Sequence, residues 1–179
     1  MREWNVLVTV QEDGYNKARR LLERYGAVGR TDFFNVLMMH VEDQQQFLGL
    51  LREEAETGNP DIQSLARVMP LILTFDFRTP EEFEAKAREA VSSMLPALSG
   101  KSFHVRMHRR GFKGRISGME EEKFLDAFLL QTLEKTGNPG RITFEDPDCI
   151  IAIETLGTRA GLSLWTRDDM KRYPLLHLD

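Results

Sequence analysis

The segment FHVRMHRRGFKGR, residues 103–115, combines the alternation of a strand with the densest positive charge in the sequence. A strand has a side-chain period of two, so a strand that begins near Ser102 has two distinct faces. One face carries apolar side chains: Phe103, Val105 and Met107. The other face carries basic side chains: His104, Arg106 and His108. The segment therefore predicts a strand with one side in the core and one cationic side.

Lysine and arginine are concentrated around this strand. Six of them fall within residues 101–115: Lys101, Arg106, Arg109, Arg110, Lys113 and Arg115. No aspartate or glutamate occurs between Ala90 and Met119, and the whole chain has a net charge of -4, so the remainder of the chain carries -10. Arginine forks bind phosphate oxygens, and each neutralised phosphate releases counterions. A polyanion, and a nucleic acid in particular, is the partner that this segment predicts.

The loop that follows the strand is suited to close approach by a ligand. Gly111 and Gly114 allow backbone to come near a bound molecule, and Phe112 offers a ring that could stack on a base or on an arginine. Charge runs are also commonly solvated, and the glutamate-rich helices nearby could pair with the arginines. The alternative hypothesis is therefore a ferredoxin-like protein-interaction or small-ligand module that does not bind RNA.

The sequence before this segment predicts a β-α-β-β-α-β order. Residues 4–10 favour a strand, a helical pattern ends at Gly26, two extended stretches follow within 27–41, and a second helix ends near Gly58. The segment RVMPLILTFDF, residues 67–77, completes the order, which is the ferredoxin-like arrangement. Pro70 indicates an edge strand or a bend, because proline cannot donate to a strand ladder.

Thr79-Pro80-Glu81-Glu82 predicts the start of a second domain. Thr79 can cap free helical amides, Pro80 suits the first helical position, and Glu82 completes a capping box. We place the boundary near Arg78, which gives a ferredoxin-like domain over residues 1–78 and a second α/β domain over 79–179. The overall class is thus α/β (α+β).

The second domain is predicted to alternate helices and strands. After the basic strand, Ser117 and Glu120 form a capping box for a helix that extends to about Lys135. The side of this helix predicted to be buried consists of Phe124, Ala127, Phe128, Leu130 and Leu133. The apolar run at 149–153 predicts a central strand covered on both faces, and a glycine-containing turn returns the chain through 162–165.

The residues that could carry out catalysis do not form a recognisable set. The histidines are scattered, with no third ligand at a matching spacing for His104 and His108, so we expect no metal site. Glu145-Asp146-Pro147-Asp148 is typical of a turn that enters a buried strand, and Cys149 lies in an apolar run. We therefore expect no enzyme activity and no cofactor. No apolar run approaches the roughly 20 residues of a membrane span, and we expect a cytoplasmic protein.

Residues 66–173 resemble a THUMP domain, the RNA-binding module of several tRNA-modifying enzymes. The features that carry the resemblance are FHVRMHRRG at 103–111, the capped helix from Ser117, EDPD followed by CIIAIE at 145–154, and GLSLW at 161–165. ARVMP at 66–70 with the helix that starts at TPEE is similar to the junction between a ferredoxin-like domain and THUMP in that family. The resemblance implies RNA contacts at Arg106, Arg109, Arg110, Lys113, Arg115, Lys101 and His108.

In the family, this pair of domains holds the acceptor stem and CCA end of tRNA and is joined to a catalytic domain. The chain ends at Asp179, so we expect no such domain here. The tail RYPLLHLD at 172–179 has a counterpart in the stand-alone THUMP adaptor that presents tRNA to a cytidine acetyltransferase. The resemblance thus implies a non-catalytic adaptor. Its partners would be tRNA and a separate tRNA-modifying enzyme, with a cytidine acetyltransferase as the candidate, and neither DNA nor membrane.

Overall fold

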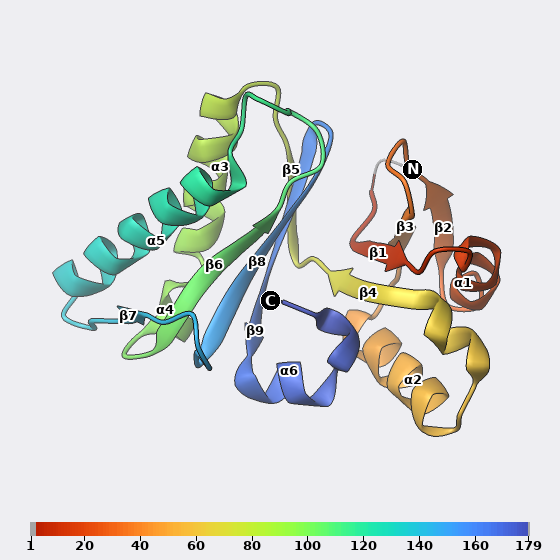
Figure 1. Ribbon diagram of the computed structural model, residues 1–179. Coiled ribbons are helices and arrows are strands. Elements are labelled where there is room, and N and C mark those ends of the chain that lie inside the picture. Colours follow the sequence, from red (N-terminus) through yellow and green to blue (C-terminus); the bar gives the residue numbers. More distant parts are fainter. Residues whose placement is uncertain (1–2, 179) are drawn as a thin grey trace. The chain divides into compact units, whose positions relative to one another are not determined.

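The computed structural model describes residues 3–178, and the contacts within it divide the chain into two compact units (Figure 1). Unit 1 contains the chain up to Leu71 together with Arg172–His177. Unit 2 contains Ile72–Lys171 together with Leu178. The chain therefore leaves unit 1 after Leu71 and returns to it at Arg172.

Unit 1 has the order of elements that the sequence predicts. These elements are β1 (Val6–Val10), α1 (Tyr15–Leu22), β2 (Ala27–Arg30), β3 (Val36–His40), α2 (Gln44–Glu56), the short 3-10 helix η1 (Pro60–Ser64) and β4 (Leu65–Pro70). The strands form one antiparallel sheet in the order β2-β3-β1-β4. The predicted β-α-β-β-α-β order is confirmed for residues 6–70.

Strand β4 is an edge of this sheet, as Pro70 indicated. Pro70 is the last residue of β4 and lies opposite Val6, where its lack of an N–H group is tolerated. The C-terminal turn η2 (Pro174–Leu176) packs against β4, and Arg67 Nε donates a hydrogen bond to the carbonyl oxygen of His177 at 2.9 Å. The C-terminal segment thus packs against β4 of unit 1.

Unit 2 is a mixed sheet with helices over one face. Its elements are β5 (Leu73–Asp76), α3 (Pro80–Ser92), α4 (Leu95–Leu98), β6 (Ser102–His108), α5 (Gly118–Lys135), β7 (Arg141–Ile142), β8 (Cys149–Leu156), β9 (Arg159–Thr166) and α6 (Arg167–Arg172). The strand order is β5-β9-β8-β6-β7, with β6 parallel to β7 and β8. Helices α3 and α5 lie side by side over one face of the sheet (Figure 1).

The structure divides residues 67–77, which the sequence predicted to be one extended segment of the first domain. Leu73–Asp76 form β5, which pairs with β9 in the second sheet. The rings of Phe77 and Phe83 meet at 5.2 Å in the core of unit 2, which gives the second half of the segment its own hydrophobic contacts. The predicted boundary near Arg78 therefore lies inside unit 2.

Strands β6 and β8 form the centre of unit 2. Residues 149–155 of β8 are all buried between β6 and β9, so the predicted central strand is confirmed. The alternation predicted for β6 is confirmed as well, because Phe103, Val105 and Met107 enter the core on the side of the helices. Its other face is the one that carries His104 and Arg106.

Helix α5 buries only part of the side predicted: Leu133 is buried, and Phe128 and Leu130 are partly buried against the core. Leu125, Leu129 and Leu133 are its buried apolar residues, whereas Phe124 is exposed and Ala127 faces solvent. The helix also has to align two carboxylates with the edge of β6, and this requirement turns Phe124 outward.

Those two carboxylates satisfy the backbone of β6 beyond the end of β7. Strand β7 pairs only with Ser102 and Phe103. Further along, Val105 N donates to Asp126 Oδ1 at 2.9 Å and Met107 N donates to Glu122 Oε1 at 2.8 Å. Residues four apart on a helix and residues two apart on a strand are both separated by roughly 6–7 Å. The spacing of Glu122 and Asp126 on α5 therefore matches the spacing of Met107 and Val105 on β6. Side chains of α5 thereby close an edge that would otherwise be open to another strand.

Two buried carboxyl groups of α5, those of Asp126 and Glu121, predict a free energy of unfolding that falls as the pH rises. Burial raises the pKa of Asp126 to about 7, and burial with the neighbouring Glu84 raises the pKa of Glu121 to about 8. At a pH between these values and about 4, the folded state keeps the protons on Asp126 and Glu121. An unfolded aspartate, with a pKa of about 3.9, has already lost its proton at that pH. Their stabilising contribution is complete below about pH 4 and is lost as the pH rises through about 7 to 8.

We expect wild-type protein to lose roughly 1–2 kcal/mol of unfolding free energy between about pH 5 and pH 8. In the Asp126→Asn variant the amide oxygen can still accept from Val105 N, but the side chain no longer titrates. The free energy of unfolding should therefore fall less steeply with pH. Urea unfolding at both pH values measures the difference. An equally steep fall in the variant would contradict the role of Asp126.

Candidate nucleic-acid interface

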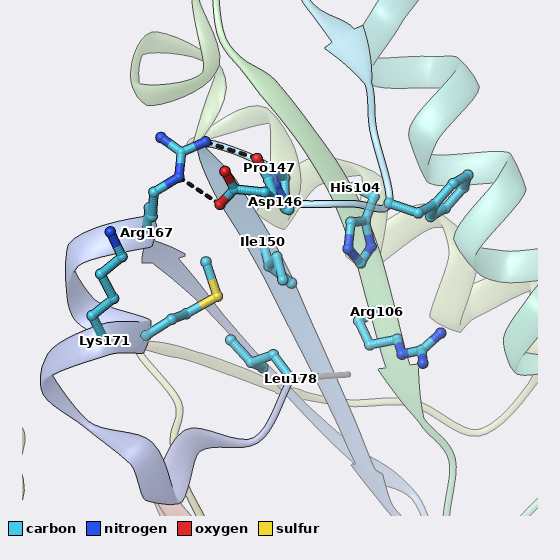
Figure 2. A pocket seen from close by; sticks show the side chains of 10 residues that line it. His104, Arg106, Asp146, Pro147, Ile150, Arg167, Lys171 and Leu178 are labelled. Carbon is cyan, nitrogen blue, oxygen red and sulfur yellow. Dashed lines mark hydrogen bonds and ion pairs between the residues drawn. The ribbon is translucent and has the colours of Figure 1, made fainter.

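The cationic face of β6 opens onto a concave site of about 440 Å³ in unit 2. Three parts of the chain line it: strand β6, the turn that enters β8, and helix α6 with Leu178. The lining residues are His104, Arg106, Phe144, Asp146, Pro147, Ile150, Arg167, Met170, Lys171 and Leu178. Figure 2 shows Arg106 on one side of the site and Arg167 and Lys171 on the other, with Ile150 between them.

Arg167 holds the turn that precedes β8. Its Nε lies 2.8 Å from Asp146 Oδ1, and its Nη2 donates to the carbonyl oxygen of Asp146 at 2.7 Å (Figure 2). Its Nη1 lies 3.1 Å from Asp148 Oδ1. Asp148 also accepts from Ser102 N at 2.9 Å, and this hydrogen bond is the main reason that the pKa of Asp148 is lowered. The EDPD sequence is therefore a structural turn that fixes one wall of the site, as its proline predicted.

Two cations of the site remain available to a ligand. No described residue forms a hydrogen bond or an ion pair with the side chain of Arg106 or Lys171. Next to Arg106 on β6, the His104 ring lies 5.2 Å from the ring of Phe144, whose surface is 73% exposed. Cations beside an exposed aromatic ring are the combination that binds single-stranded nucleic acid, through phosphate contacts and base stacking.

Arg110, in contrast, anchors the loop after β6. Its Nη1 lies 2.5 Å from Oε2 of Glu154, a carboxylate on β8 that is completely buried. Arg110 N donates to Thr155 Oγ1 at 2.9 Å, and the Arg110 carbonyl accepts from Gly157 N at 2.8 Å. His108 Nδ1 lies 3.6 Å from the other oxygen of Glu154. This arginine is paired internally, as the alternative hypothesis suggested, but with a strand carboxylate instead of a helical one.

The remaining loop divides into an inward and an outward part. Arg109 Nη1 donates to the carbonyl oxygen of Gly111. Phe112 packs on Phe77 with ring centroids 5.1 Å apart, so its ring supports the core. The guanidinium carbon of Arg115 lies 4.9 Å from the centroid of Phe112, and Lys113 and Arg115 are both exposed. The outward part of the loop thus presents these two cations.

Gly111 is required by the close approach of two backbone segments. Its φ is +101°, and a Cβ at this position would lie 3.0 Å from the Cα of Gly157. Any side chain would therefore push the loop away from the β8–β9 turn and disturb the contacts of Arg110.

The structure does not gather all seven predicted residues into one patch. Lys101 precedes β6 and lies roughly 26 Å from Arg109, because the chain between them is extended at about 3.3 Å per residue. Arg106 opens onto the concave site, whereas Lys113 and Arg115 belong to the loop that follows β6.

Sequence reasoning missed part of the concave site. Phe144, Arg167, Lys171 and Leu178 were not among the predicted residues, although they line it together with Arg106. Arg167 could have been found as the partner of the clustered aspartates at 146 and 148. No comparable signal marks Lys171 or Leu178, because their position depends on how α6 follows β9.

Comparison with known proteins supports the fold. No protein-family model matches this sequence, and no curated protein does. Among solved structures, PH1313 from Pyrococcus horikoshii Ot3 is 12% identical with a TM-score of 0.59, covering 92% of this chain and 55% of that one. A 4-thiouridine synthetase in complex with RNA and ATP is 16% identical with a TM-score of 0.56, covering 92% and 42%. TrmN from Thermus thermophilus is 15% identical with a TM-score of 0.59, covering 90% and 44%.

The fold is THUMP-like. At these identities the likeness concerns the fold alone, and this chain spans about half the length of the structures that it matches. Among residues 3–178, no helix has both the length and the apolar character needed to cross a membrane.

Proposed function

We propose that this protein binds the acceptor stem and CCA end of tRNA and presents the tRNA to a separate modifying enzyme in the cytoplasm, without catalysing the modification itself. A cytidine acetyltransferase is the candidate enzyme. The observation that carries the proposal is the concave site, which Arg106 and Lys171 line together with Phe144, whose ring is exposed. Its size suits an RNA end, since sites for small ligands measure roughly 300–1,000 Å³.

The contacts proposed for the RNA involve the face of β6 that lines the concave site and the loop that follows the strand. In the concave site, Arg106 and Lys171 would bind phosphates while a terminal base stacks on Phe144. Lys113 and Arg115 would extend the contact along the backbone of the stem, with the free part of the Arg109 guanidinium between them. We assign Arg110 to positioning this loop, and give Lys101 and His108 at most a peripheral electrostatic role.

Binding of fluorescent tRNA at several salt concentrations tests the proposal. The Lys171→Ala variant removes one proposed phosphate contact, so the slope of log affinity against log salt should fall by about one unit. The Lys135→Ala variant, which removes an exposed lysine at the end of α5, should leave the slope unchanged. Affinity for tRNA no higher than affinity for an acidic protein would exclude RNA binding.

The competing function is an interaction or small-ligand module that does not bind RNA. The pairing of Arg110 with Glu154 favours it, because this pair shows that part of the basic segment serves the fold. A pull-down from cell extract, followed by RNA sequencing and mass spectrometry, separates the two functions. Recovery of tRNA together with a modifying enzyme supports the adaptor, whereas recovery of proteins alone supports the module.

A further inference from the structure

The two edge strands of the sheet of unit 1, β2 and β4, have different surroundings. The turn η2 packs along β4, whereas no strand within the described part of the chain pairs with the outer side of β2. An open edge presents unpaired backbone donors and acceptors, which can accept an extended peptide as an additional strand.

An acidic pocket of about 400 Å³ begins at the first residue of this open edge. Ala27 of β2 forms part of its wall, and its apolar lining includes Tyr25, Phe47 and Leu50. Glu42 and Asp43 are exposed at the pocket, and its ten lining residues include no lysine or arginine. The pocket therefore suits a cationic side chain whose aliphatic part packs on the rings and whose charge meets the carboxylates.

The aromatic wall is already held in place. Tyr25 OH donates to Glu54 Oε1 at 2.5 Å, and the Tyr25 ring lies 5.9 Å from that of Phe47. Burial and this hydrogen bond raise the pKa of Tyr25 to about 12, so the hydroxyl remains a donor across the physiological range. A ligand would thus meet a formed pocket and would not need to order it first.

We propose that the outer edge of β2 and this pocket bind an extended, cationic segment of a partner protein, which joins the sheet as a fifth strand. The backbone edge supplies hydrogen bonds to the segment, and Glu42 and Asp43 select an arginine or lysine at its end. Nucleic acid is disfavoured as the occupant because the two carboxylates that line the pocket are negative, and Arg24, which lies over the Tyr25 ring, is paired with Glu54. The inference rests on the proposed function only in that an adaptor needs a protein-binding surface apart from its RNA site. The test of the inference contains no RNA, so the inference and the proposed function can fail independently.

A synthetic peptide tests the surface directly. The probe is a fluorescein-labelled octapeptide of alternating valine and threonine with arginine at both ends, and its binding to the full chain is followed by fluorescence anisotropy. We expect binding that weakens at least about fivefold when the arginines are replaced by glutamates, and similarly when alternate backbone nitrogens are methylated. Amide shifts in labelled protein should include Ala27–Arg30.

Matched variants separate the pocket from net charge. Glu42→Gln with Asp43→Asn removes two charges, while the asparagine can still accept from Gln46 N as Asp43 does at the start of α2. This variant should bind the arginine peptide at least about fivefold more weakly. Glu12→Gln with Asp13→Asn removes two exposed charges outside the pocket and should bind as wild type does.

Three results would overturn the inference: no binding of the arginine peptide, equal losses in the two double variants, or amide shifts that spare residues 27–30. Dimerisation of the wild-type chain through the same amides would also overturn it, since it would assign the edge to a second copy of the chain.

Discussion

Changing Arg106 to glutamate should weaken tRNA binding by at least about tenfold at moderate salt. Arg106 is the cation of β6 that opens onto the concave site, and no described residue pairs with it. A hydrogen bond to a charged group contributes roughly 1.5–3 kcal/mol, and the new carboxylate would also repel phosphate. Fluorescence anisotropy with labelled tRNA measures the loss.

The matched control is Arg88→Glu, which makes the same change of charge on α3, the helix-covered side of the sheet. It should retain wild-type affinity within about twofold, because only a long-range, salt-screened interaction is altered. Circular dichroism establishes that both variants are folded. Equal losses in the two variants would show that net charge, and not the concave site, governs binding.

Changing Glu154 to leucine should lower the free energy of unfolding by about 3 kcal/mol or more. Glu154 is completely buried, and its loss leaves the mostly buried guanidinium of Arg110 without its carboxylate. Breaking a buried pair from one side is far more destabilising than replacing both partners by apolar residues. Chemical denaturation with urea gives the difference.

The double variant Glu154→Leu with Arg110→Met separates structure from RNA contact. It should recover much of the stability lost in the single variant, since no unpaired charge then remains at this position. If Arg110 acts by positioning the loop, tRNA affinity should recover along with stability. Recovery of stability without any recovery of affinity would instead assign Arg110 a direct contact with RNA.

The parts of the fold that were predictable from sequence depend on local patterns. The period of two in β6 gave its core face, and the apolar run of β8 gave a central strand, because both signals lie within a single segment. The pairing of β5 with β9 was not predictable in this way. It joins Leu73 to Leu162, and no local pattern specifies which sheet an edge strand will join.

The same limit applies to the candidate site. A basic segment was visible in the sequence, but the role of each cation depends on distant residues. Arg110 points inward because it pairs with the buried carboxylate of Glu154. In the sequence, a carboxylate at the end of a buried apolar run indicates that a buried cation lies nearby. The buried side of α5 was predicted only in part for a related reason: hydrogen bonds from Val105 and Met107, on another element, select which side of the helix faces the sheet.

The return of the chain to unit 1 at Arg172 has a consequence for how the protein folds during its synthesis. Residues 72–171 of unit 2 are translated after the strands of unit 1 and before the turn that packs against β4. Until residues 174–176 emerge, β4 lacks this contact, and open sheet edges favour aggregation of nascent chains. The four strands of unit 1 therefore lack their contact with residues 174–176 while residues 72–171 are being made.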